Sequence, residues 1–506
     1  MNFPVWELGF APGLLMAVVA TLHVFVSHFA IGTGLFLVIT ERKAYREDDA
    51  ELLSYLKRHS LVFIMVSVVF GAVSGVGIWF VIGLINPAVT SSLIHAFVFG
   101  WAIEWVFFIV EILAGLIYYY GWDKLRRDTH LTIGWIYFIA AFLSLVVING
   151  IVTFMLTPAG WLENREFWTG FFNPTYFPSL VSRTFLSLAL AGIYALVTAS
   201  FIKETGVHRR ITRYAGIWIV ANMVLFELSL LWYWKAMPET VYQAAAGAIP
   251  ITVNMLDARL TLSAITVIIA LFTALIVPKL NKIPVAVAIM VLALGVFGSS
   301  EWIRESVRKP YSISQYIYTN GIFPSEVGAI NEKGILASAK WISDEARHGD
   351  NYLQSGYEIF RVECMSCHTE NGYLGIADKI KGWEKEFIFE ITARLDSLRG
   401  KMPPFAGTEA DRRMLTEYLS TLAGASRSFA DGKEVFEDRC GICHTVGQYR
   451  NIIPMVADFT YEDLNDAVLA GLQDMNGNMP PFTGNADARE KLAKYLASLK
   501  DAKRTK

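Results

Sequence analysis

Cys364-Met365-Ser366-Cys367-His368 and Cys440-Gly441-Ile442-Cys443-His444 stand in the last third of a chain of 506 residues and contain all four of its cysteines. In a CxxCH pentapeptide the two thiols attach a haem covalently, and the histidine takes one axial position on its iron. The pattern therefore predicts two covalent haems. The predicted attachment points and iron ligands are Cys364, Cys367, Cys440, Cys443, His368 and His444.

Two CxxC units could instead supply four thiolates to one zinc ion. Three features oppose zinc: the histidine that follows each motif, a Met-Pro-Pro-Phe run after each, and a repeat between the two halves. Glu358-Ile359-Phe360 precedes the first motif much as Glu434-Val435-Phe436 precedes the second. A repeat as long as a small domain, with its own haem signature, predicts two tandem domains that resemble class I cytochromes c.

Each of these domains needs a second axial ligand for a six-coordinate iron. Met402 and Met479, which begin the two Met-Pro-Pro-Phe runs, are the candidates, since a thioether ligand raises the reduction potential. A methionine that only fills a gap in a small core is the alternative. Met475 is a weaker candidate than Met479 because no prolines follow it.

The residues before the haem motifs are expected to lie in a membrane. Composition is 54% hydrophobic and 18% charged, and the apolar residues are concentrated before residue 303. Runs long enough to cross a bilayer lie near residues 10–40, 60–85, 93–120, 132–157, 179–202, 212–235, 257–277 and 283–303. The sequence therefore predicts an all-α protein, with a polytopic bundle of about eight transmembrane helices followed by two small α-helical cytochrome c domains.

Basic residues are shared unequally between the two sides of this bundle. One set of loops carries, among others, Arg42, Lys43, Lys57, Lys124, Arg126, Arg209, Arg210 and Lys279, whereas the opposite loops carry Arg165 and a few basic residues at helix edges. Short cytoplasmic loops are enriched in Lys and Arg, so both termini are expected in the periplasm. The predicted location is a bacterial inner membrane, crossed several times, with the cytochrome c domains in the periplasm.

The predicted organisation has four parts. Residues 1–309 form the membrane domain, 310–352 a linker with a short helical piece, 353–425 the first cytochrome c domain and 426–506 the second. A net charge of −2 gives no reason to expect a nucleic-acid partner.

Ionisable residues inside the spans are costly and are usually retained for a function. Glu104 and Glu111 are two helical turns apart on one face and could pass protons from the cytoplasm to a buried site. The alternative is that they pair with arginines at helix ends or cap polar contacts within the bundle. His23 lies well inside the first span, where an imidazole could be a haem ligand or could be hydrogen-bonded within the bundle.

Several stretches resemble, in order and spacing, subunit I of the cytochrome bd-type terminal oxidases over about residues 1–325. These stretches are Leu22 to Gly32, Gly71 to Gly75, Ala102 to Glu104 with Glu111 and Gly121 to Leu125, Met155 to Trp161, and Glu305 to Tyr311. The resemblance implies two non-covalent haems, b-type or d-type, in the membrane domain. It also implies His23 and Glu305 as their iron ligands, Glu104 and Glu111 as proton-path carboxylates, and Arg308 as a partner of Glu305 or of a propionate.

The sequence departs from the family where a third, low-spin haem and a quinol site would be. Arg183 and Thr261 occupy the expected ligand positions, and the loop before the seventh span has only about twenty residues. Arg183 and Arg259 are expected to hold haem propionates or a cytochrome domain instead. The two c-type haems would then replace quinol as the electron entry.

The resemblance and the motifs together predict a terminal oxidase subunit that takes electrons from a periplasmic, cytochrome c-like donor and reduces O2 to water. The alternative is a non-catalytic electron conduit between a quinol or partner subunit and periplasmic cytochromes, in which His28 and His95 could be replacement ligands. A gas sensor is disfavoured because two haems c would be superfluous to it. The sequence leaves open a second membrane subunit or a homo-oligomer.

The first prediction concerns the covalent haems. Mass spectrometry of the chain, made with a periplasmic haem-attachment system, should show two haem additions, and Cys440→Ala with Cys443→Ala should remove one. Met402→Ala or Met479→Ala should keep both additions but open the sixth iron position and lower the potential of that haem. Fewer than two additions on the unaltered chain would contradict the motif assignment.

Overall fold

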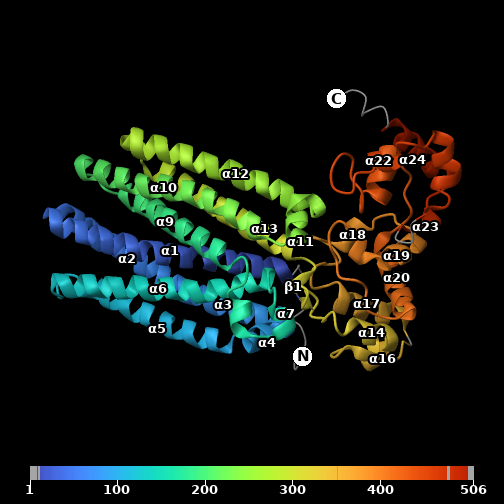
Figure 1. Ribbon diagram of the computed structural model, residues 1–506, viewed down its shortest axis with the longest axis horizontal. Coiled ribbons are helices and arrows are strands. Elements are labelled where there is room, and N and C mark those ends of the chain that lie inside the picture. The colour runs from blue at the N-terminus through green and yellow to red at the C-terminus, as the bar shows by residue number, and fades with distance from the viewer. Residues whose placement is uncertain (1–7, 9–11, 350, 476–478, 500–506) are drawn as a thin grey trace.

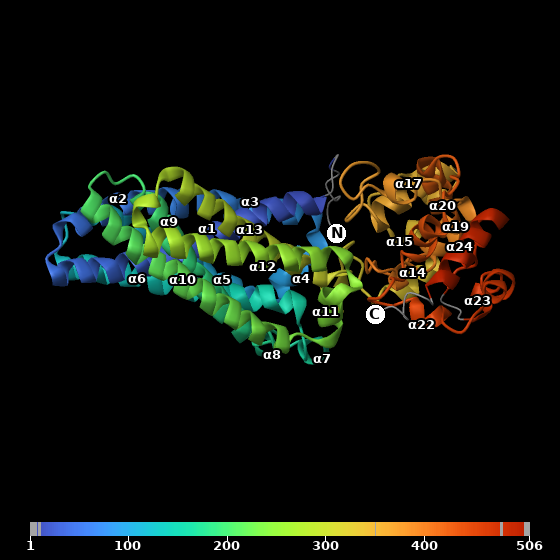
Figure 2. The same cartoon turned by 90° about the horizontal axis from the view of Figure 1, so that it is seen from above.

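The computed structural model describes residue 8 and residues 12–349, 351–475 and 479–499. It shows a long helix bundle with two smaller helical lobes at one end (Figure 1). We call the end that carries these lobes the near end of the bundle and the opposite end the far end. The view from above shows the same division (Figure 2).

In the described chain, eight helices are long and apolar enough to span a membrane, which confirms the predicted number. They are α1 (Pro12–Glu47), α2 (Ala50–Ile64) continued by η1 (Met65–Phe70) and α3 (Gly71–Ile85), α5 (Val98–Gly121), α6 (Arg127–Leu156), α9 (Tyr176–Ala199), α10 (Thr205–Ala236), α12 (Pro250–Ala270) continued by η3 (Leu271–Ile276), and α13 (Ile283–Arg308). Several start earlier or end later than the apolar runs, because polar turns extend them beyond the lipid-facing part.

Short elements connect the spans. At the near end these are α4 (Pro87–Ala96), α7 (Trp161–Asn164), α8 (Phe167–Phe171), α11 (Glu239–Gln243) and η2 (Ala244–Ala248), and at the far end η4 (Pro278–Leu280). The connection between α10 and α12 is shorter than the predicted twenty residues, since α12 already begins at Pro250. The bundle core is built from buried aromatic and aliphatic side chains of α1, α2, α9, α10 and α13.

The segment predicted as a linker, residues 310–352, is folded against the first lobe. A hairpin of β1 (Tyr311–Ile313) and β2 (Ile317–Tyr318) is followed by α14 (Val327–Lys333), α15 (Ile335–Ser338) and α16 (Asp344–His348). Buried apolar residues of this segment, such as Ile335, share one core with the first lobe. The glycine and proline residues of this segment predict turns, but the sequence does not indicate that its apolar residues share a core with the first lobe.

The two lobes have the same plan. The first contains α17 (Tyr352–Glu363), α18 (Ile376–Lys379), α19 (Lys385–Thr392), η5 (Leu395–Ser397) and α20 (Glu409–Ala423). The second contains α21 (Gly432–Val435), η6 (Phe436–Cys440), α22 (Ile453–Val456), η7 (Asp463–Val468), α23 (Leu472–Met475) and α24 (Ala486–Ser498).

One glycine in each lobe marks the same helix crossing. A Cβ on Gly356 would lie 2.2 Å from the carbonyl oxygen of Met414, and a Cβ on Gly432 would lie 2.0 Å from that of Lys491. Both crossings pack the first helix of a lobe on its last helix, and both are too close for any side chain. This equivalence agrees with the repeat seen in the sequence.

Candidate haem sites

Both CxxCH motifs form the same tight turn at the end of a helix. In the first, the N–H groups of Cys367 and His368 donate to the carbonyl oxygen of Cys364 at 3.0 and 2.9 Å. In the second, those of Cys443 and His444 donate to Cys440 at 3.0 and 2.8 Å. All four cysteines are described, and each is a free, half-buried thiol. The thiols and the imidazole of each motif are therefore presented from one turn, as haem attachment requires.

Each motif histidine is oriented by its Nδ1 atom. His368 Nδ1–H donates to the carbonyl oxygen of Leu374 at 3.0 Å, and His444 Nδ1–H donates to that of Arg450 at 3.2 Å. This bond fixes the tautomer that leaves Nε2 free for a metal. Burial lowers the pKa of both imidazoles, which favours the neutral form that binds iron. These features fit a haem in each lobe.

The two predicted distal ligands, Met402 and Met479, are less exposed than the weaker candidate Met475. Met402 packs against the core of the first lobe, and Met479 is half-buried in the second. Met475 is 52% exposed, so its side chain points away from the second lobe. Among the described residues, no three His, Cys, Asp or Glu side chains converge as a metal site, so the two CxxC pairs do not form the four-thiolate zinc alternative.

The second haem motif lies against the first lobe. The N–H of Arg399 donates to the carbonyl oxygen of Ile442, inside the second CxxCH, at 2.9 Å. Arg439, directly before that motif, forms an ion pair with Glu384 at 2.6 Å and its guanidinium stacks over Phe387. Arg399 stands three residues before Met402, so the two haem-binding regions are neighbours.

The first lobe in turn rests on the near end of the bundle. The ring of Tyr373, in the loop after the first CxxCH, meets the ring of Trp302 of α13 with centroids 6.3 Å apart. Lys401 Nζ, next to Met402, donates to the carbonyl oxygen of Thr240 at 3.2 Å. The loop after the first haem motif and the residue next to Met402 are thus both held on the membrane domain.

Within the bundle, His23 of α1 faces α3. Its Nδ1 is 3.1 Å from the hydroxyl oxygen of Ser74, and its ring packs on the backbone at Gly75. The contact with Ser74 orients the ring and leaves Nε2 for an iron. The arrangement fits the predicted haem ligand. It equally satisfies the hydrogen-bonded alternative, so the role of His23 stays a prediction.

Glu305 lies near the end of α13, between two arginines. Arg304 is 2.8 Å away, Arg308 forms a second ion pair, and the carboxylate remains 42% exposed. Arg308 also donates to the sulfur of Met155 at 3.4 Å, while its buried Nε–H finds no acceptor among the described residues. A buried donor without a partner fits a missing anionic group such as a haem propionate.

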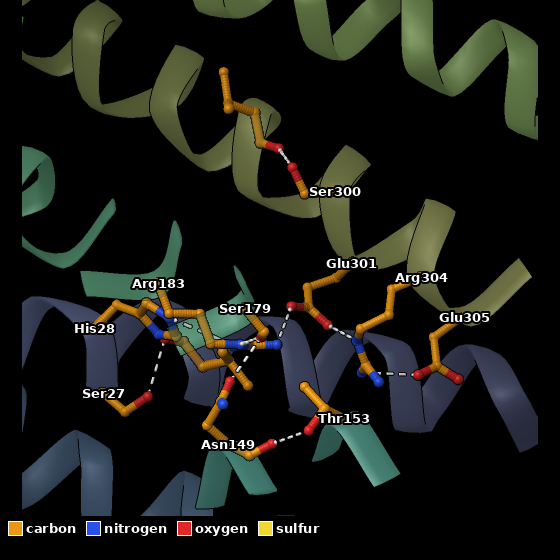
Figure 3. A network of polar contacts seen from close by, with 12 residues as sticks. Ser27, His28, Asn149, Thr153, Ser179, Arg183, Ser300, Glu301, Arg304 and Glu305 are labelled. Carbon is orange, nitrogen blue, oxygen red and sulfur yellow. Dashed lines mark hydrogen bonds and ion pairs between the residues drawn. The ribbon is translucent and has the colours of Figure 1, made fainter. Parts of the chain in front are cut away.

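A chain of alternating charges continues from Glu305 into the bundle (Figure 3). Glu301 pairs with Arg304 at 2.8 Å and with Arg183 of α9 at 3.3 Å. Arg183 in turn lies 3.5 Å from Nε2 of His28, whose Nδ1–H donates to a backbone carbonyl. Both nitrogens of His28 are therefore engaged within the protein. The pairing of Arg183 with Glu301 was not apparent from the sequence.

Arg259 is satisfied by a partner that the sequence did not indicate. One guanidinium nitrogen contacts both carboxylate oxygens of Glu227, at 2.8 and 2.9 Å, and Arg259 is buried. The predicted role in holding a propionate stays a prediction. His95 is exposed and donates from Nδ1 to the carbonyl oxygen of Ser91.

The two carboxylates of α5 each meet a hydroxyl of α6. Ser144 donates to Glu104 at 2.9 Å, and Tyr137 donates to Glu111 at 3.0 Å. Neither carboxylate pairs with an arginine among the described contacts, which disfavours the ion-pair alternative. The hydroxyl contacts equally satisfy the other alternative, that the glutamates cap polar contacts in the bundle, so the proton path stays a prediction. Tyr137 and Ser144 are seven residues apart, as are Glu104 and Glu111. This equal spacing is the sequence signal that could have predicted the two hydroxyl partners.

Residues 13–245 match the family model for cytochrome bd terminal oxidase subunit I. Residues 351–419 and 427–496 each match the model for subunit III of the cbb3-type cytochrome c oxidase. A solved structure of bd oxidase from Geobacillus thermodenitrificans is similar with a TM-score of 0.51 and 17% identity, over 60% of this chain and 88% of that chain. No curated protein sequence matches.

The apolar bundle and the two haem-binding folds define a multi-pass membrane redox protein. Residues 13–245 of the bundle are similar to cytochrome bd terminal oxidase subunit I, and two cytochrome c domains follow in the same chain. The cytochrome c domains imply covalent haem c, and the bd family implies haems of b or d type.

The charge chain of Figure 3 generates a prediction about assembly. Glu301→Gln leaves Arg183 and part of Arg304 without compensation, which should cost toward the lower end of about 3–5 kcal/mol because the pair is slightly exposed. Thermal unfolding of the purified holoprotein should show a lowered midpoint. The double variant Arg183→Gln with Glu301→Gln should recover much of the loss, and Glu239→Gln on the exposed α11 should change nothing. Equal loss in the single and double variants would contradict direct coupling.

Proposed function

We propose that this protein is a membrane terminal oxidase subunit. It takes electrons from a periplasmic donor through two c-type haems to a buried high-spin haem pair that reduces O2 to water. The observation that carries the proposal is the continuous series of contacts from the second CxxCH to the first lobe and from the first lobe to α13.

The series has a direction. The second lobe contacts the first through Arg399 and Arg439 and also lies beside the bundle, where Tyr449 is next to Gly247. The haem loop of the first lobe rests on Trp302. Trp302 stands one helical turn before Glu305, the proposed ligand of a membrane haem. In the proposed path a donor docks on the second lobe, and its electrons pass through the first lobe to the site of oxygen reduction.

The chain's own residues would prepare the oxygen site. Arg304 and Arg308 form ion pairs with Glu305, and Arg308 keeps one buried N–H for a propionate. Ser74 orients His23. Bound haems would supply the irons that carry electrons and bind oxygen.

Protons would come from the far end of the bundle, which we assign to the cytoplasm because its loops carry most of the basic residues. Glu111 with Tyr137 and Glu104 with Ser144 are the proposed route. Electrons from the periplasm and protons from the cytoplasm would meet inside the membrane. Each such charge is worth about 2.3 kcal/mol per 100 mV.

A quinol donor is disfavoured by the near end of the bundle. The two positions expected to ligate a low-spin haem hold Arg183 and Thr261. Arg183 forms an ion pair with Glu301 and does not present a neutral iron ligand, and Thr261 is exposed. The connection from α10 to α12 holds only α11 and η2. A conduit with His28 as replacement ligand is disfavoured as well, since both nitrogens of His28 are in use.

The donor experiment tests the proposal. The purified holoprotein should consume O2 rapidly with reduced soluble cytochrome c, and slowly or not at all with a short-chain quinol. Carbon monoxide should shift the spectrum of the reduced protein, because an open high-spin haem binds it. Fast quinol oxidation that persists after removal of both CxxCH pairs would refute the proposed donor. No carbon monoxide shift and no O2 consumption would favour the conduit.

The proton route gives a further prediction. Glu111→Gln should lower steady-state O2 consumption roughly tenfold or more while reduction of the c-type haems stays fast, since the amide keeps the shape but cannot titrate. The matched control is Glu163→Gln, an exposed carboxyl at the near end. Unchanged turnover in Glu111→Gln would remove this residue from the route.

A further inference from the structure

A second buried polar cluster lies at the far end of the bundle, where α1 ends, α5 ends and α6 begins. Tyr118 O–H donates to Glu41 Oε2 at 2.7 Å, and His130 Nδ1 lies 2.7 Å from Glu41 Oε1. His130 Nε2 lies 2.8 Å from the carbonyl oxygen of Tyr118. Glu41 is 0% exposed, and the other two residues are each 2% exposed. Neither the redox path nor the route described above uses this cluster.

The hydrogen bonds fix how many protons the cluster holds. A carbonyl oxygen can only accept, so His130 Nε2 must carry a hydrogen. The phenol hydrogen of Tyr118 is committed to Glu41 Oε2. One further proton must lie between Glu41 Oε1 and His130 Nδ1, either on the carboxyl or on the imidazole. The cluster is therefore a buried site in which Glu41 and His130 share one proton.

This cluster continues the spacing of the proposed proton route. Along α6, His130, Tyr137 and Ser144 are successive members of one seven-residue series. Along α5, the series is Tyr118, Glu111 and Glu104, and each α5 member contacts the corresponding α6 member. Residues seven apart lie on one face of a helix, about 10 Å from each other. The polar groups thus form three levels of one interface between α5 and α6.

Helix α1 lines the same interface. A Cβ on Gly34 would lie 2.5 Å from Cε1 of Tyr137, so the tyrosine ring lies directly on α1. Glu41 is seven residues further along the same helix, at the level of His130. Gly34 thereby allows α1 to approach the contact between Tyr137 and Glu111, and Glu41 of α1 joins the contact between His130 and Tyr118.

The cluster also reaches toward the surface. Tyr45, one turn beyond Glu41, is half-buried, interacts with the Glu41 carboxylate, and has the guanidinium of Arg127 over its ring at 5.0 Å. Arg127, the first residue of α6, is exposed. Tyr45 therefore lies between the exposed Arg127 and the buried Glu41.

We propose that Glu41, Tyr118 and His130 form the proton-loading site of this route. The proposal rests on the proposed function, since it supplies protons to Glu111. The Glu41–His130 pair releases its shared proton inward and regains one from the far-end solvent, so one proton enters for each that leaves. The step of about 10 Å to Tyr137 and Glu111 requires intervening water molecules.

The test uses the full holoprotein reconstituted into vesicles, with O2 pulses and a pH dye on the far-end side. Glu41→Gln, which cannot share the proton, should slow proton uptake and turnover roughly tenfold or more. Reduction of the c-type haems, the haem content and the spectra should stay unchanged. Glu41→Asp should restore part of the rate, and Asp128→Asn, an exposed carboxyl in the same first turn of α6, should have no effect.

A purely structural ion pair predicts a different pattern. In that case Glu41→Gln would lower the unfolding temperature but leave turnover per folded molecule and proton uptake as they are, and the proposal would be overturned. Tyr118→Phe, which removes one hydroxyl only, replaces Glu41→Gln if that variant does not assemble. Its expected effect is slower uptake without haem loss, and normal uptake would count against the site.

Comparison with Glu111→Gln separates this proposal from the proposed function. Slow turnover in Glu111→Gln with normal turnover in Glu41→Gln and His130→Gln would keep the route but reject the loading site. Normal turnover in all three variants would reject both.

Discussion

The charges at the end of α13 must be compensated within the protein because the surrounding bundle is apolar. Two carboxylates, Glu301 and Glu305, alternate with Arg304 and Arg308, and Arg183 of α9 extends the series. Removing any one charge would leave a neighbour unpaired at a cost that exceeds most single packing defects. This compensation joins α9 to α13 and fixes the helix end on which the first cytochrome domain rests.

The same constraint explains which features could be predicted from the sequence. The number of spans followed from the length of apolar runs, and the covalent haem motifs from residue spacing alone. Partners across the bundle did not follow, because helical periodicity defines the faces of one helix but not which faces meet. The ion pairs of Arg183 and of Arg259 with glutamates on other helices are of this kind.

Residues 310–352 show a second limit of sequence reasoning. Glycine and proline in this segment indicate turns, and the sequence predicts a linker with a short helical piece. The apolar residues between the turns are too few and too irregular to show a helical or strand period. They become recognisable as core residues only when the first lobe supplies the other half of the contact, as at Ile335 and Ile359.

That shared core has a mechanical consequence. A haem domain on a long free tether searches for its docking site, and linker length sets how often it arrives. Here the connecting segment is itself part of the domain, so the first lobe is stiffly mounted and has no such search to make. In the proposed electron path, only the encounter between an outside donor and the second lobe would be a diffusive event. Ionic strength should then influence that one meeting and leave the transfers inside the chain unaffected.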